Sequence, residues 1–196
     1  MNYKNALLAG ALAVFAVPAF SQTSSPAPVV NKRKENQQDR IANGVQSGQM
    51  TAGETKNIEK KEAGLNGEEN RMKKRDDGNL TKADKARLTR QQNRLSNQIY
   101  KDKHNARMQN TNPKTEVGQR QRNQQERIAQ GIKSGQMTAG EASHMEGREA
   151  AVNHEIHNDR AANGGKLTGQ ERAQINHQQN RNSRAVYRKK HNGRVQ

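Results

Sequence analysis

Cysteine is absent from the 196 residues, and aromatic residues make up only 3% of them. Without cysteine the chain forms neither a disulfide framework nor a Cys-based metal or redox site. With so few aromatic rings it lacks the stacking platforms that OB-fold and RRM-like proteins use for single-stranded nucleic acid. Hydrophobic residues of all kinds reach only 29%. Folds that need a large buried core, such as TIM barrels and doubly wound sheets, are therefore excluded.

Positive charge is the abundant feature of the chain. Lys and Arg number 35 against 19 Asp and Glu, which gives a formal net charge of +16. A charge of this size favours association with partners of the opposite sign and keeps a protein with a small core in solution. It says nothing about the fold, which must be inferred from the pattern of the sequence.

The N-terminus has the pattern of a secretory signal peptide. Lys4 precedes an apolar run over 6–17, and small residues lead up to Ser21 as signal peptidase requires. The run is shorter than the roughly 20 residues that cross a bilayer. We predict a signal peptide over 1–21, cleavage near Ser21 and Gln22, and a periplasmic or secreted mature protein without a transmembrane segment.

The rest of the chain contains one unit twice. Residues 36–107 align with 123–194 at a constant offset of 87, with 34 identities in 72 positions and no gap. The phrase Ser-Gly-Gln-Met-Thr-Ala-Gly-Glu at 47–54 returns unchanged at 134–141. Such agreement indicates an internal duplication, so that residues 87 apart are expected to have the same place in two copies of one structure.

Each repeat carries the start and stop signals of helices. A Thr stands three residues before a Glu or Asp at four places, and each pair predicts a capping box at a helix start. These pairs are Thr51 with Glu54, Thr81 with Asp84, Thr138 with Glu141, and Thr168 with Glu171. A Gly shortly before each box suits the left-handed residue that closes the preceding helix.

The fold class is therefore mainly α, with two tandem three-helix units of the form helix-turn-helix-turn-helix. The expected helices cover 36–47, 51–74 and 81–105 in helical repeat 1 (36–107), and 123–134, 138–161 and 168–192 in helical repeat 2 (123–194). Residues 22–35 are predicted to be a disordered leader and residues 108–122 a linker, because they contain the prolines and basic runs outside the repeats.

The apolar stripes of the expected helices are narrow. Ile58, Leu65 and Met72 recur seven residues apart, and in the last helix of the second repeat the stripe is broken by Asn182, where the first repeat has Leu95. We therefore expect helices that contact one neighbour each. The middle helices are acidic and the last helices basic, which favours antiparallel packing of one on the other. An isolated unit should be marginally stable and should need its second copy or a partner.

The most distinctive motif is Tyr-x-x-Lys-His-Asn at the end of each repeat. It comprises Tyr100, Lys103, His104 and Asn105, and again Tyr187, Lys190, His191 and Asn192. One interpretation is a ligand-binding or partner-binding surface with Tyr as an amphipathic anchor. The other is a helix C-terminus in which Tyr packs on a neighbouring helix, Lys and His offset the helix dipole, and Asn closes the turn. All eight residues are candidates for ligand or partner binding.

Three phrases carry a resemblance to known proteins. They are Gly-x-x-Ser-Gly-x-Met-Thr-x-x-Glu at 44–54, Gly-x-Leu-Thr-x-x-Asp at 78–84, and Tyr-x-x-Lys-His-Asn. The chain resembles a set of small, exported, uncharacterised bacterial proteins with tandem repeats of these phrases. The resemblance covers both repeats. It implies an envelope location and a helical fold, and it implies no particular activity.

The same phrases distantly resemble the second half of an EF-hand loop. With Gly78 at the sixth loop position, the first, third and fifth positions would be Lys73, Arg75 and Asp77, which offer too few oxygen ligands for calcium. A degenerate EF-hand-like calcium-binding protein remains an alternative, while the capping boxes explain the Gly, Thr and acidic residues without a metal.

Sites for metals and for catalysis have little support. His154 and His157 lie one helical turn apart and are weak candidates for a shared metal, since zinc sites use three or four protein ligands. No nucleophile elbow, phosphate-binding loop or cofactor motif is present. We therefore expect no enzymatic activity and no cofactor.

The sequence thus favours an exported, basic, non-enzymatic helical repeat protein of the cell envelope. The expected ligand is polyanionic: an anionic envelope component, an acidic protein partner, or nucleic acid bound without sequence specificity. Besides calcium binding, the open alternative is a structural or chaperone-like envelope protein that becomes ordered on binding. Assembly into a homo-oligomer is compatible with each of these functions.

Overall fold

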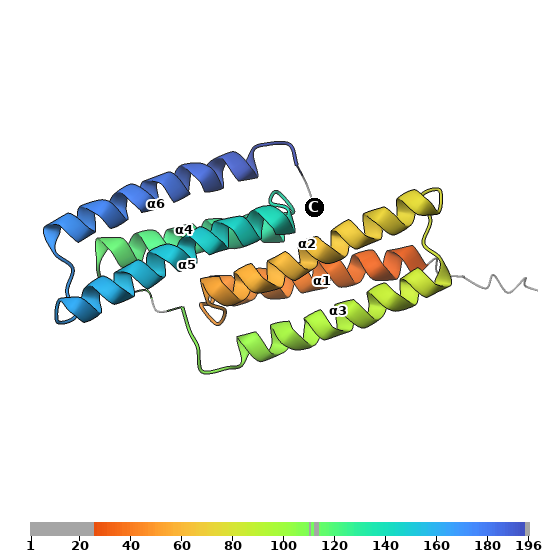
Figure 1. The fold of residues 1–196 in the computed structure, drawn as a ribbon, viewed down its shortest axis with the longest axis horizontal. Coiled ribbons are helices and arrows are strands. Elements are labelled where there is room, and N and C mark those ends of the chain that lie inside the picture. The colour runs from red at the N-terminus through yellow and green to blue at the C-terminus, as the bar shows by residue number, and fades with distance from the viewer. Residues whose placement is uncertain (1–25, 110, 112–113, 195–196) are drawn as a thin grey trace, which may run out of the picture.

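The computed structural model describes residues 26–109, 111 and 114–194, and in this part of the chain it contains six α-helices and no strand (Figure 1). The helices are α1 (Pro26–Gln46), α2 (Ala52–Arg75), α3 (Lys82–Lys103), α4 (Glu116–Lys133), α5 (Ala139–Ala162) and α6 (Gly169–Lys190). The prediction of a mainly α fold made of two tandem three-helix units is confirmed. The expected signal peptide and its cleavage site lie outside the described residues.

Helix starts and ends follow the local signals in the sequence. All four expected Thr residues are N-caps of complete capping boxes, at the starts of α2, α3, α5 and α6. Gly48 and Gly135 have φ angles of 72° and 69°, and Gly78 and Gly165 have φ angles of 86° and 87°. Each of these glycines therefore supplies the left-handed residue that the tight turn before the next helix requires.

The first helix of each repeat is longer than the sequence predicted. α1 begins at Pro26 and α4 at Glu116, so each helix starts within the segment that the sequence assigned to the leader or to the linker. The reason is tertiary. Val30 and Val117, which are 87 residues apart, are both buried, and their carbonyl oxygens accept hydrogen bonds from glutamine side chains of α3 and α6 at 3.2 and 3.0 Å.

The two repeats pack against each other through their first two helices. α2 lies along α5 and α1 along α4, while α3 covers α1 and α2, and α6 covers α4 and α5. Each of the four inner helices thus contacts at least three others, so the expectation of one neighbour per helix is wrong. α3 and α6 make no contact with each other and lie on opposite sides of the elongated molecule (Figure 1).

Three apolar clusters lie along the molecule. The central cluster draws on both repeats and includes Ile41, Met50, Ile128 and Met137. The two outer clusters belong to one repeat each. One contains Met72, Leu80 and Leu88, and the other contains Val117, Val152, Ile156 and Ile175. None of the described helices combines the length and apolar character needed to cross a bilayer.

Candidate functional site

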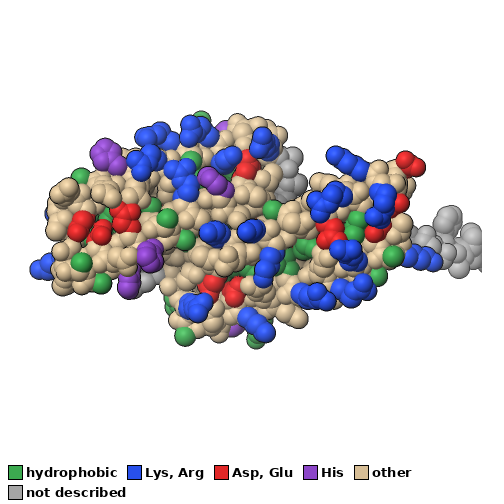
Figure 2. All heavy atoms as spheres, viewed as in Figure 1, with side chains coloured by type: hydrophobic (Ala, Val, Ile, Leu, Met, Phe, Trp, Pro, Cys, Tyr) green, Lys and Arg blue, Asp and Glu red, His purple; other side chains and the backbone are tan. Residues whose placement is uncertain are grey.

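The outward faces of α3 and α6 carry exposed cations at matched positions. Arg94 and Lys101 on α3 correspond to Arg181 and Arg188 on α6, and all four are exposed. A spacing of seven residues places the two members of each pair on one side of the helix. Within the described residues no carboxylate pairs with any of the four. Figure 2 shows Lys and Arg side chains spread over both ends of the visible face, with Asp and Glu in small groups.

Side chains of the inner helices hold each outer helix in place by the same contacts. Arg40 donates to the hydroxyl and the carbonyl oxygen of Ser96, both at 3.1 Å. Arg127 makes the equivalent pair of bonds to Ser183, at 2.6 and 3.3 Å. One step along, Arg33 of α1 donates to an asparagine of α3 at 3.0 Å. The basic faces are therefore fixed to the core and extend onto the first helix of each repeat.

The Tyr and His residues of the duplicated motif face the solvent. Tyr100 and Tyr187 are 59% and 58% exposed. Each ring stacks on the motif's own histidine, His104 or His191, with ring centroids 4.2 Å apart in both repeats. More than half of each tyrosine is in contact with solvent, whereas the purely structural interpretation of the motif expects the ring to be packed on a neighbouring helix. The structure therefore leaves these four side chains accessible to a ligand.

The Asn and Lys residues of the motif contribute to the fold instead. Asn105 donates to the capping-box carboxylate Glu54 at 2.8 Å, and Asn192 donates to Glu141 at 2.6 Å. These bonds tie the end of each outer helix to the start of the middle helix. The aliphatic part of Lys103 packs close to the backbone at a helical glycine of α1, as does that of Lys190 at its counterpart in α4. The motif thus combines a structural closure with an exposed aromatic pair.

Four buried glutamates of the middle helices were not foreseen from the sequence. Glu59, Glu62 and their counterparts Glu146 and Glu149 are almost completely buried. Glu149 faces α6 but bonds there to Asn182 and not to a cation, so this contact is not the charge pairing that the sequence predicted. Gln38 of α1 donates to Glu59 at 3.4 Å, while the equivalent glutamine of α4 donates to Glu146 at 3.0 Å. The signal that could have revealed them is their exact retention in both copies.

Burial sets the ionisation of these carboxyl groups. It raises the pKa of Glu146 to about 8 and that of Glu149 and Glu62 to about 7. Burial, and then the proximity of Glu62, raise the pKa of Glu59 well above its ordinary value. A carboxyl group that is neutral near pH 7 can lie in an apolar seam at a lower cost than a charged one. The stability contributed by these buried carboxyl groups is therefore sensitive to pH.

The polar break in the second apolar stripe has a structural reason. Asn182 is buried and donates to Glu149 at 3.0 Å. In the first repeat the same place holds Leu95, and neither carboxyl oxygen of Glu62 has a hydrogen-bond partner. The second repeat thus satisfies a buried carboxyl group that the first repeat leaves without a donor.

The metal candidates are not brought together. His154 and His157 are both exposed, and His154 makes a 3.1 Å contact with Asn158. Among the described residues, no three His, Asp or Glu side chains are placed to hold a metal ion. The turns that resemble EF-hand loops instead close helices, as shown by the 2.7 Å bond from the Gly78 amide to the Lys73 carbonyl oxygen.

Comparisons of this chain with models of protein families, with curated proteins and with solved structures found no match. Its function must therefore be inferred from its own residues and their arrangement.

Proposed function

We propose that this protein is an exported, non-enzymatic envelope protein that binds polyanionic ligands through the outward faces of α3 and α6. The observation that carries the proposal is the matched set of exposed cations, Arg94 and Lys101 on one face, Arg181 and Arg188 on the other. Exposed cations without carboxylate partners attract polyanions by charge and by release of counterions.

An acidic polysaccharide fits these faces better than a membrane does. The only large exposed apolar side chain on each outer helix is the tyrosine of the duplicated motif, so little apolar surface is present to enter a bilayer. Exposed amides such as Asn93 and Asn97 lie among the cations and can exchange hydrogen bonds with sugar hydroxyls. The exposed ring of Tyr100 can pack on the apolar face of a sugar.

The placement of the two faces gives the interaction its geometry. Because α3 and α6 lie on opposite sides of the molecule (Figure 1), two separate polyanion chains can be held at once. A single long chain would have to wrap around the inner helices to reach both faces. The expected activity is therefore bridging of anionic polymers in the envelope, with each face contributing its own binding event.

The test is titration of the protein with heparin, a model acidic polysaccharide, at low and high salt. We expect binding that weakens steeply with salt. Reversing all four cations (R94E, K101E, R181E and R188E) should abolish it, whereas reversing the exposed α2 cations Lys56, Lys60, Arg71 and Lys74 to Glu changes the net charge equally and should largely preserve it. Equal loss in both variants would show nonspecific attraction to net charge and would contradict the proposal.

Bridging is tested with the half-variants. R94E with K101E, and R181E with R188E, should each bind heparin at half the stoichiometry and should no longer cross-link heparin-coated beads. Anionic vesicles and double-stranded DNA are titrated in parallel. Stronger binding to vesicles or to DNA than to heparin would show that the ligand is not an acidic polysaccharide.

A further inference from the structure

The two repeats differ at one buried position that carries charge in the first. There the carboxylate of Glu69 lies between two cations, with Lys34 at 2.8 Å and Lys73 at 2.6 Å. Burial alone would raise the pKa of Glu69, but the hydrogen bonds from Lys34 and Lys73 lower it below its ordinary value. The first repeat thus holds an internal anion at the outer end of its helical bundle.

The second repeat keeps a cation at this place and lacks the anion. The residues 87 positions further on are Gln121, Ile156 and Arg160, so the carboxylate is replaced by an apolar side chain. Arg160 is half-buried, and no described carboxylate pairs with it. An arginine without a counter-charge in the structure is available to pair with an anion.

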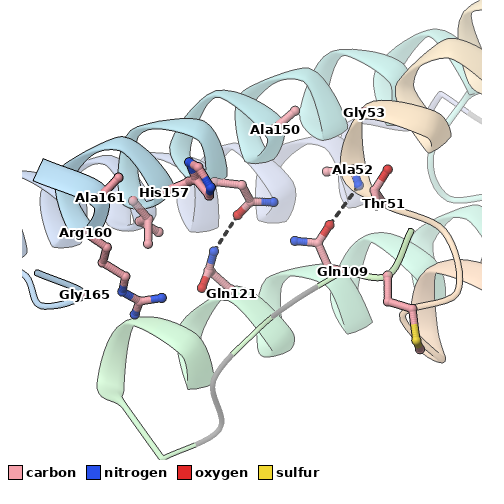
Figure 3. Close-up of a pocket in the computed structure, with 13 residues that line it drawn as sticks. Thr51, Ala52, Gly53, Gln109, Gln121, Ala150, His157, Arg160, Ala161 and Gly165 are labelled. Atoms are coloured by element: carbon pink, nitrogen blue, oxygen red, sulfur yellow. Dashed lines mark hydrogen bonds between the residues drawn. The ribbon is translucent and has the colours of Figure 1, made fainter. Parts of the chain in front are cut away.

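Arg160 lines a cavity of about 570 Å³, which is a volume typical of small-molecule sites. The cavity lies between α5, the start of α4 and the N-terminal end of α2, and Arg160 and Gln121 extend toward it from different helices (Figure 3). Its other polar side chains include Gln109, Asn153 and His157, and none of the described residues that line it is acidic.

One wall of the cavity is held by the segment that follows the first repeat. The amide of Gln109 donates to the Gly48 carbonyl oxygen at 2.9 Å, and its side-chain oxygen accepts from the Ala52 amide at 3.0 Å (Figure 3). Arg160 also borders a second hollow of about 800 Å³, to which Lys166 and Arg172 contribute. This second hollow is also lined by Glu116, whose carboxylate pairs with Arg120, whereas Arg160 is the one cation among the described residues that line the first cavity.

We propose that this cavity binds a small hydroxylated carboxylate, such as a hexuronate, whose carboxylate pairs with Arg160. A guanidinium suits a carboxylate because it donates two parallel hydrogen bonds. The amides of Gln121, Asn153 and Gln109 are placed around the same space and exchange hydrogen bonds with hydroxyl groups. The ligand's carboxylate thus does in the second repeat what Glu69 does in the first. The site shares no residue with the faces of α3 and α6 and does not depend on the function proposed for them.

The test is calorimetric titration of the full chain with glucuronate, inorganic phosphate and glucose. Glucuronate should bind in a salt-sensitive manner, and glucose should not bind. R160Q should weaken glucuronate at least about tenfold, since it removes the charge-assisted pair. K73Q is the matched control: it changes the equivalent cation of the first repeat and should leave glucuronate affinity unaltered.

A second variant keeps the test decisive. I156E supplies a carboxylate where the first repeat has Glu69, and it should abolish glucuronate binding while the helical content is retained. The variant with all four outer cations reversed should still bind glucuronate, which separates this site from heparin binding. Absence of glucuronate binding, equal affinity in R160Q, or binding of phosphate alone would each overturn the proposal.

Discussion

Near the centre of the molecule, the glycine and methionine at the turn between the first two helices have the same surroundings in both repeats. A Cβ atom added at Gly44 would lie 2.7 Å from the sulfur of Met50, and one added at Gly131 would lie 2.7 Å from that of Met137. At the outer ends the repeats differ, with Glu69 in one and Ile156 in the other. Central residues contact both copies, so a change in one copy disturbs the other. Residues at an outer end contact only their own repeat and are free to differ.

The largest expected effect is a pH dependence of stability caused by the buried glutamates. The pKa values of Glu62, Glu146 and Glu149 are raised from 4.5 to about 7, 8 and 7, so the folded protein binds more protons than the unfolded chain between these limits. The stability that these raised pKa values contribute is fully present below about pH 4.5 and is lost as pH rises through 7 to 8. We expect the free energy of unfolding to fall by several kcal/mol, on the order of 5, between pH 5 and pH 9, measured by urea denaturation.

The control for this prediction is the double variant E146Q/E149Q. Its amides cannot ionise, so its stability should depend on pH less than that of the original protein, with Glu59 and Glu62 left to titrate, and it should be the more stable of the two at pH 9. A flat profile for the original protein would show that the buried glutamates have ordinary pKa values in the folded state. Equally steep profiles in both proteins would show that Glu146 and Glu149 do not cause the pH dependence.

The next effect distinguishes the central cluster, which both repeats share, from an outer cluster that belongs to one repeat. Ile128 and Ile175 are both fully buried, the first in the central cluster and the second in the outer cluster of the second repeat. Replacing either with Ala should lower the free energy of unfolding by about 2 to 5 kcal/mol. In hydrogen exchange, I128A should lower amide protection in both repeats, whereas I175A should lower it mainly in α4, α5 and α6. Loss confined to the second repeat in both variants would mean that the repeats fold independently.

The helix boundaries could be predicted where their cause is local. A Thr and an acidic residue three positions apart make a capping box from their own side chains, which is why the starts of α2, α3, α5 and α6 were found. The start of α1 was missed because its buried Val30 is held by a hydrogen bond from Gln92, 62 residues away. Contacts of that range leave no periodic signal within a short segment.

The buried glutamates and the cavity beside Arg160 could not be predicted from the sequence, for a different reason. Glutamates on a helix with few apolar neighbours are normally solvated, so Glu59 and Glu146 appeared as part of an acidic surface. They are buried by the packing of α2 against α5 together with their contacts to glutamines of α1 and α4. Ile156 appeared simply as part of an apolar stripe, although its exchange with Glu69 leaves Arg160 without the carboxylate that its counterpart has. By contrast, the duplicated tyrosine motif and the basic outer helices were apparent from the repeat alone, although the repeat left open whether the tyrosines are exposed.

A smaller effect on stability is expected at the outer ends, where the two repeats differ. E69Q removes the charge that pairs with Lys34 and Lys73 in the first repeat and should lower stability by about 1 to 2 kcal/mol at pH 7, because Lys34 retains some contact with solvent. R160Q changes the equivalent charged end of the second repeat and, in the absence of a ligand, should leave stability within about 0.5 kcal/mol. Thermal denaturation of both variants in the same buffer measures the comparison. A larger loss in R160Q than in E69Q would contradict it.

The smallest effect on stability is expected for the exposed aromatic pair, where the two repeats are alike again. Y100A/Y187A should change the free energy of unfolding by less than about 0.5 kcal/mol per site, because both rings are more than half exposed. N105A/N192A should cost about 1 kcal/mol per site, since it removes the bonds that join each outer helix to the carboxylates Glu54 and Glu141. Heparin binding should show the opposite order, with the tyrosine variant weakened and the asparagine variant nearly unchanged once its fold is intact. Urea denaturation and heparin titration of the same preparations give both orders. A tyrosine variant that is less stable than the asparagine variant would show that the rings stabilise the fold, and one that binds heparin normally would exclude them from the interface.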